Sequence, residues 1–168
     1  SRIVLAETDP TDSNIVYCMS NDGGFYVLDW VGGTLASKTG VLGVAGTYGE
    51  DFSDASPGDY GLMVADDGAV IVPNLFGLTT QFIIYRSTDG GDTWTANDLT
   101  VQFFNPGSLD FLELFTEVHS DGTLLIQTGK QFFWSTDNGI SWSVSSALPI
   151  VGRSGFTNAA AMASYVKI

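Results

Sequence analysis

The sequence predicts an all-β fold. Short apolar runs rich in Val, Ile, Phe and Tyr alternate with clusters of Gly, Asp, Asn and Ser along nearly the whole chain, a pattern typical of strands and turns. One turn sequence occurs twice, which indicates a repeated unit. The best helical candidate, the Ala-rich run 158–164, continues into 164–168, which alternates like a strand. We therefore expect no helix and a terminal strand over 157–168.

The first predicted unit of four strands spans about 1–40. Residues 3–7 and 14–19 are apolar runs on either side of an Asp-Pro-Thr-Asp turn, and 25–30 is a third run. Residues 31–34 are expected to form the turn that follows it, at the place of the repeated turn described below but without its Asp. This unit is degenerate compared with the other two.

The second and third units, about 57–100 and 108–148, match each other strand for strand. In the second unit the strands are expected at 60–64, 69–72, 81–85 and 93–96. In the third unit they are expected at 111–118, 123–127, 131–134 and 141–144. A tight turn containing Asp-Gly separates the first two strands of each of these units.

The repeated turn follows the third strand of these two units. Residues 86–94 and 134–142 share the pattern Ser-x-Asp-x-Gly-x-(Thr/Ser)-Trp. An Asp side chain can accept hydrogen bonds from N–H groups of the turn, Gly allows a positive φ, and Trp packs the hairpin on its neighbours. The residues are therefore expected to be structural: Ser87, Asp89, Gly91, Thr93, Trp94, Ser135, Asp137, Gly139, Ser141 and Trp142.

This turn resembles the Asp box, or BNR repeat, of the β-propeller superfamily that includes sialidases, sortilin-type receptors and xyloglucan-cleaving hydrolases. The resemblance implies a propeller-like module of three four-stranded antiparallel blades plus the terminal strand. Three blades leave a ring incomplete, because propellers have typically about four to eight. Self-association, membership of a longer polypeptide, an open or trimeric arrangement, and closure by the terminal strand all remain open.

The resemblance also implies that ligands bind at the end of the blades opposite the Asp boxes. The loops expected there are 20–24, 73–80, 127–130, 101–110 and the long segment 40–58. Around the last of these, aromatic rings that could stack on sugars occur among carboxylates that could accept sugar hydroxyls. Equally, the segment could be a solvated acidic loop. The candidate protein- or glycan-binding residues are Tyr48, Glu50, Asp51, Phe52, Asp54, Asp59 and Tyr60.

Charge and composition exclude several classes of partner. The chain has 168 residues, with 6 Lys+Arg against 19 Asp+Glu and a formal net charge of -13. Nucleic acid and anionic membranes therefore find few cations to bind. No apolar run is long enough to predict a membrane span. Cys18 is the only cysteine, so no intramolecular disulfide is expected.

The sequence lacks the residue sets expected at several kinds of catalytic and metal site. A sialidase-like site needs three arginines for the substrate carboxylate, and the chain has only Arg2, Arg86 and Arg153. The carboxylates leave a two-carboxylate hydrolase arithmetically open, but such clefts normally lie between two complete propellers. His119 precedes a turn and has no triad partners at suitable spacing. No zinc site, other metal site or cofactor is expected.

These observations favour a non-enzymatic structural, adhesion or assembly module that presents its loops to a protein or glycan. We expect self-association or a larger assembly, in an extracellular, virion or cell-surface setting. The alternative is a fragment of a larger Asp-box glycoside hydrolase or sialidase-like enzyme. A basic, complete propeller of the photosystem-assembly type fits this short acidic chain less well.

Overall fold

The computed structural model describes residues 3–20, 24–38, 61–76, 81–99, 114–127 and 131–145. This part of the chain is all β and contains no helix, as the sequence predicts. Its strands are β1 (Ile3–Thr8), β2 (Ile15–Ser20), β3 (Phe25–Asp29), β4 (Thr34–Ser37), β5 (Met63–Val64), β6 (Val70–Phe76), β7 (Gln81–Ser87), β8 (Thr95–Asp98), β9 (Phe115–Val118), β10 (Leu124–Gln127), β11 (Phe132–Ser135) and β12 (Ser143–Val144).

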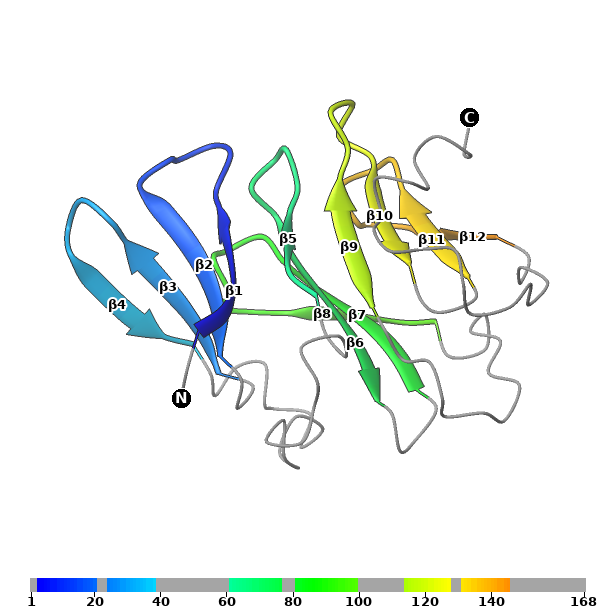
Figure 1. The fold of residues 1–168 in the computed structure, drawn as a ribbon, viewed down its shortest axis with the longest axis horizontal. Helices are drawn as coiled ribbons and strands as arrows, with labels where there is room; N and C mark the ends of the chain where they lie inside the picture. Colours follow the sequence, from blue (N-terminus) through cyan, green and yellow to red (C-terminus); the bar gives the residue numbers. More distant parts are fainter. Residues whose placement is uncertain are drawn as a thin grey trace, which may run out of the picture.

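The strands form three four-stranded antiparallel sheets, each built from consecutive strands. The first sheet is β1–β4, the second β5–β8 and the third β9–β12, and within each sheet neighbours in sequence are neighbours in space. The predicted grouping into three units of four strands is therefore confirmed. The opening strands of consecutive sheets are close together, β1 beside β5 and β5 beside β9, and the sheets follow one another across Figure 1 from left to right.

The second sheet has a hydrophobic core on each of its faces. One face packs on the first sheet, and its cluster comprises Tyr17, Met19, Phe25, Leu62, Val64, Val70, Val72 and Tyr85. The other face packs on the third sheet, and its cluster comprises Met63, Ala65, Ala69, Ile71, Phe82, Ile84, Leu114, Leu124, Ile126 and Phe133. Because successive side chains of a strand point to opposite faces, the nearly continuous apolar runs of β6 and β7 supply both clusters.

The prediction of a loop over 73–80 was wrong for its first residues. Residues 73–76 belong to β6, where Pro73 pairs with Ile84 of β7. A proline is tolerated here because the Pro73 carbonyl accepts a 3.3 Å hydrogen bond from Gly61 N–H, on the β5 side. The N–H that proline lacks would point to this same side, where the short β5 (Met63–Val64) has already begun to diverge. The pairing with β7 therefore loses no donor.

The fourth strands of the second and third sheets begin later than predicted. The structure places them at Thr95–Asp98 and Ser143–Val144 instead of 93–96 and 141–144. The residues at the predicted starts, Thr93 and Ser141, bond to turn carboxylates instead. The expected terminal strand at 157–168 lies outside the described residues.

Candidate functional site

The loop residues proposed to bind a partner lie outside the described part of the chain. They are Tyr48, Glu50, Asp51, Phe52, Asp54, Asp59 and Tyr60. The described candidate residues are those of the two repeated turns, which the structure shows in full side-chain detail.

In the β7–β8 turn, Ser87 and Asp89 have different roles. The buried Ser87 hydroxyl donates to Asp89 Oδ1 at 2.7 Å and accepts from the buried Gly91 N–H at 2.8 Å. The Asp89 carboxylate is exposed, and it accepts from Thr93 N–H at 2.8 Å and from Thr93 Oγ1 at 2.5 Å. Gly91 has a φ of 92°, which favours glycine. The serine thus accepts the bond from the buried N–H of the turn, whereas the aspartate accepts bonds from exposed groups. The sequence pattern does not reveal this difference.

The β11–β12 turn repeats this bonding. Ser135 Oγ donates to Asp137 Oδ1 at 2.7 Å and accepts from Gly139 N–H at 2.8 Å. Asp137 accepts from Ser141 N–H at 2.9 Å and from Ser141 Oγ at 2.5 Å. Serine therefore replaces the threonine of the other turn without loss of a hydrogen bond.

These bonds hold both carboxyl groups ionised. Hydrogen bonds from the side chain and backbone of Thr93, and from Ser87, lower the pKa of Asp89 to about 2. The Ser141 side chain and backbone do the same for Asp137, whose pKa is also about 2. A carboxyl group with so low a pKa is a poor proton donor at neutral pH, whereas glycosidase acids have raised pKa values.

The tryptophans that end the two turns pack inward. Trp94 Nε1 donates to the Gly91 carbonyl at 3.1 Å, and its ring meets the ring of Phe25 in the first sheet edge-on at 5.2 Å. Trp142 packs against the cluster between the second and third sheets. Its Nε1 is buried and has no hydrogen-bond partner in the structure.

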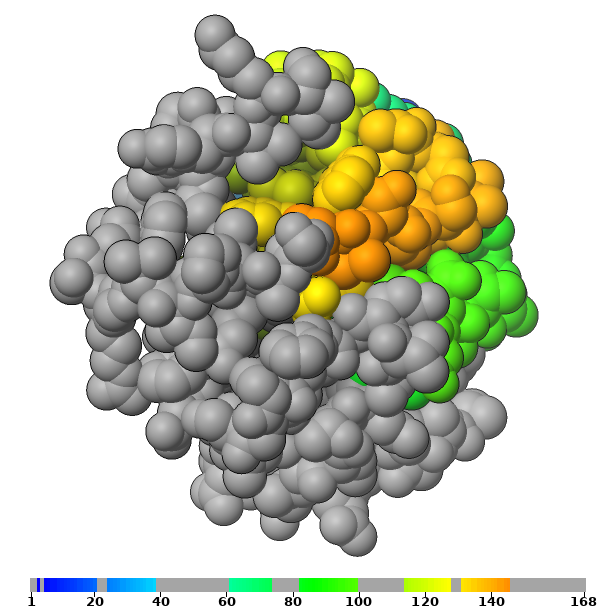
Figure 2. All heavy atoms as spheres, turned by 90° about the vertical axis from the view of Figure 1, so that its right-hand side faces the viewer, coloured from blue at the N-terminus to red at the C-terminus, as the bar shows by residue number. Residues whose placement is uncertain are grey.

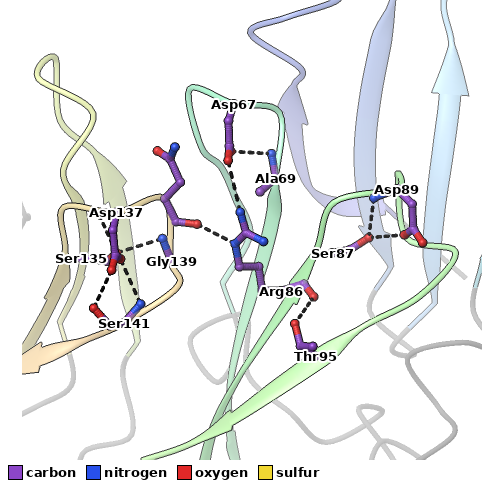
Figure 3. A network of polar contacts seen from close by, with 11 residues as sticks. Asp67, Ala69, Arg86, Ser87, Asp89, Thr95, Ser135, Asp137, Gly139 and Ser141 are labelled. Carbon is purple, nitrogen blue, oxygen red and sulfur yellow. Dashed lines mark hydrogen bonds and ion pairs between the residues drawn. The ribbon is translucent and has the colours of Figure 1, made fainter.

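Arg86 connects the second sheet to the turn of the third (Figure 3). Its Nε donates to the Asn138 carbonyl at 2.8 Å, and its Nη2 lies 3.1 Å from Asp67 Oδ2. Asp67 also accepts from the Ala69 N–H at 3.0 Å. This guanidinium is therefore engaged in contacts within the fold.

The turn between β1 and β2 contains a buried carboxylate that the sequence pattern did not identify. Asp9 is buried, and its carboxylate accepts from Thr11 N–H at 2.8 Å, Thr11 Oγ1 at 2.7 Å and Tyr17 Oη at 3.0 Å. Burial alone would raise the pKa of Asp9, but these hydrogen bonds outweigh it and lower the pKa. Burial and the adjacent Asp9 raise the pKa of Tyr17. The sequence feature that could have predicted this buried carboxylate is an Asp before Pro-Thr in a turn, followed by a Tyr at an inward-facing position of the next strand.

The β3–β4 hairpin lacks the bonding pattern of the two repeated turns, and it exposes apolar side chains. Asp29 Oδ1 accepts from Gly32 N–H at 2.7 Å in place of the serine bond of the other turns. Trp30 and Val31 at its tip are each 74% exposed, and Leu35 on β4 is 57% exposed. We call these three residues the hairpin patch.

Other chemistry is sparse in the described segments. His119 Nδ1 lies 3.0 Å from Asp121 Oδ1, but both side chains are exposed in the β9–β10 turn and have no nucleophile in a triad arrangement. Across these segments, no group of three or more His, Cys, Asp or Glu residues could hold a metal ion. Nor do they contain a helix long and apolar enough to cross a membrane. Cys18 is a buried free thiol, and burial raises its pKa.

No protein-family model matches the chain, and no curated protein matches it.

Proposed function

We propose that this chain is an Asp-box, propeller-like structural module that binds a protein or glycan partner and performs no catalysis. One observation carries the proposal: both Asp-box carboxylates accept side-chain and backbone hydrogen bonds within their own turns, which lower their pKa values to about 2. These residues stabilise hairpins, and they are not arranged to donate or abstract a proton.

The propeller-like arrangement is supported by the way the sheets are stacked. Opening strands of consecutive sheets are adjacent, and each Asp-box turn leans on the sheet before it. Gly91 lies against the Phe25 ring, and Gly139 lies against the Ile71 side chain. The same relation between neighbouring sheets therefore occurs twice, as radial repetition of blades requires.

The antiparallel order also separates the two ends of the sheets. The Asp-box turns and the tight β5–β6 and β9–β10 turns share one end (Figure 1). The strand ends at Ser20, Phe76 and Gln127 point to the other, towards the loops where the resemblance implies binding. A module with structural turns at one end can vary its opposite loops without unfolding.

The test is binding measured alongside hydrolysis. Immobilised chain is challenged with a panel of defined oligosaccharides, and the same panel is incubated with chain in solution and assayed for reducing sugar and free sialic acid. We expect saturable binding without release of sugar. The double variant Tyr48→Ala/Phe52→Ala, which removes two rings able to stack on sugars, should lose glycan binding and keep the wild-type melting temperature. Catalytic release of sugar would overturn the proposal and favour a glycoside hydrolase fragment.

If no glycan binds, the module is expected to bind a protein. Cross-linking of the purified chain within its native source material, followed by mass spectrometry, would identify that partner. Loss of the cross-links in the variant at 48 and 52 would assign the contact to this loop.

A further inference from the structure

We propose that two copies of this chain join head to tail, the first sheet of each packing on the third sheet of the other, to form one ring of six sheets. The inference rests on the propeller-like stacking in the proposed function, and it names a second copy of the chain as the partner that covers the apolar side chains exposed at Trp30, Val31, Leu35 and Phe115.

The first argument is the repeated relation between sheets. The turn after the third strand packs on the preceding sheet in two cases, at Gly91 against Phe25 and at Gly139 against Ile71. The equivalent turn of the first sheet carries the hairpin patch, and in the described structure no sheet precedes it. Trp30, Val31 and Leu35 supply three of the seven large hydrophobic side chains that the described residues expose. A concentration of exposed apolar side chains of this kind indicates an interaction surface.

The second argument is the pairing register, which identifies the face that would receive the hairpin patch. Gly139 packs on Ile71 of the second sheet. Ile71 pairs with Arg86, and Arg86 is the residue directly before Ser87, the first residue of the second sheet's Asp box. In the third sheet the residue directly before Ser135 is Trp134, and it pairs with Leu125. Leu125 therefore occupies in the third sheet the place that Ile71 occupies in the second.

The outer face of the third sheet is apolar around this position. Leu125 shares the face with its partners Trp134 and Glu117. The next row of the same face holds Phe115, Gln127 and Phe132, of which Phe115 is exposed and Phe132 is already buried. Figure 2 looks at the molecule from this side, where yellow and orange atoms of β11 and β12 reach the surface.

Phe115 is the best-placed residue to test this outer face. It is exposed and corresponds to Gly61, which lies against Thr116 and Leu114 of the following sheet. By the same relation, Phe115 should contact the opening strand of the sheet that follows in the partner.

The third argument is charge. The chain carries a formal net charge of -13, which opposes association of two copies unless their contact faces are free of carboxylates. On the outer face of the first sheet, the strand residues in register are all uncharged: Ile3, Ala6, Thr8, Val16, Cys18, Ser20, Tyr26, Leu28, Leu35 and Ser37. The outer face of the third sheet has one charged strand residue, Glu117, whose Oε2 is buried and lacks a hydrogen-bond partner in the structure.

The fourth argument is closure. Sheets stacked by a repeated rotation form a ring at typically about four to eight blades. Two copies of three sheets give six, and three copies would exceed this range. A closed dimer buries the outer faces of both copies, whereas an open chain of copies always leaves two exposed.

The test is the native mass of the full chain, measured by light scattering on a sizing column over a range of concentrations. One chain weighs 17.9 kDa, so we expect a single species of twice that mass with no higher oligomers. Leu35→Glu alters the outer face of the first sheet, and Phe115→Glu alters that of the third. Each single variant should give the monomer mass.

The matched control is Ile140→Glu. Ile140 is 63% exposed on an Asp-box turn and lies on neither outer face, so this variant adds the same charge and should stay dimeric. Circular dichroism melting curves establish that each variant is folded. If Leu35→Glu melts below the assay temperature, Leu35→Ser replaces it.

Each outcome decides the inference. A monomeric wild-type chain, a species above the dimer, or dissociation by only one of the two face variants overturns head-to-tail closure. A longer natural polypeptide that supplies its own sheet against the hairpin patch overturns it as well. Binding and sugar release are measured on the same samples: a monomer that still binds a partner overturns only the dimer, whereas a dimer that releases sugar overturns only the proposed function.

Discussion

The Ser87 hydroxyl should contribute more to stability than the Asp89 carboxylate of the same turn. Ser87 is 1% exposed and accepts a 2.8 Å hydrogen bond from the buried Gly91 N–H. In Ser87→Ala that N–H has no acceptor, and leaving a buried donor unpaired costs about 1–3 kcal/mol. The variant also loses the bond to Asp89 Oδ1, which is solvated and adds little.

We expect Ser87→Ala to lower the free energy of unfolding by roughly 1–3 kcal/mol, measured by urea denaturation at neutral pH. For a domain of this size each kcal/mol lowers the melting temperature by about 2–4 °C. Thr95→Ala is the matched control, because it removes an exposed hydroxyl that donates to the Arg86 carbonyl at 3.1 Å. Its change should stay within about 0.5 kcal/mol. A Ser87→Ala loss no larger than that of the control would refute the assignment of the buried bond.

The other predictions concern pH, turn packing and the link between sheets. The pKa values of Asp89 and Asp137 are about 2 against an ordinary 3.8, so their stabilisation is present above about pH 4 and lost as the pH falls towards 2. Melting temperatures between pH 5 and 2 should fall less steeply when both are changed to Asn; equal slopes would contradict the pKa shifts. Gly33→Ala, at a φ of 63° with open space around it, should cost about 1–2 kcal/mol of backbone strain. Gly91→Ala should destabilise the chain by about 1–3 kcal/mol more than Gly33→Ala, because its Cβ would also meet an aromatic ring of the first sheet. Equal urea midpoints for the two variants would place the turn away from that ring. Arg86→Met should lower stability by about 1–2 kcal/mol through loss of the bond to the neighbouring turn, and an unchanged urea midpoint would show that this bond contributes nothing.

Local sequence pattern was sufficient to predict the all-β class and the three units of four strands. Alternating apolar runs specify strands, and Asp-Gly turns specify where the chain reverses, both through interactions a few residues apart. The strand boundaries that were predicted wrongly depend on contacts that the local pattern does not encode. Residues 73–80 were predicted to be a loop, whereas β6 continues through Pro73, because the arrangement of β5 leaves no donor needed at that position.

The roles within the repeated turn were predictable only in part. Residue types and spacing indicated that Asp89 and Gly91 stabilise a tight turn, since their contacts are local. They did not show that Ser87 satisfies the buried donor, because burial of the turn comes from the first sheet packing over it. The same holds for Arg86, whose acceptor is the carbonyl of Asn138 in another sheet.

The set of strands and turns therefore follows from local sequence, because hydrogen bonding and apolar alternation within each hairpin are encoded by neighbouring residues. Which apolar faces are covered depends instead on how the sheets pack. The second sheet is buried on both faces, whereas the β3–β4 hairpin leaves Trp30 and Val31 exposed. Strand alternation gives both faces of a sheet similar side chains, and burial depends on which sheet packs against each face.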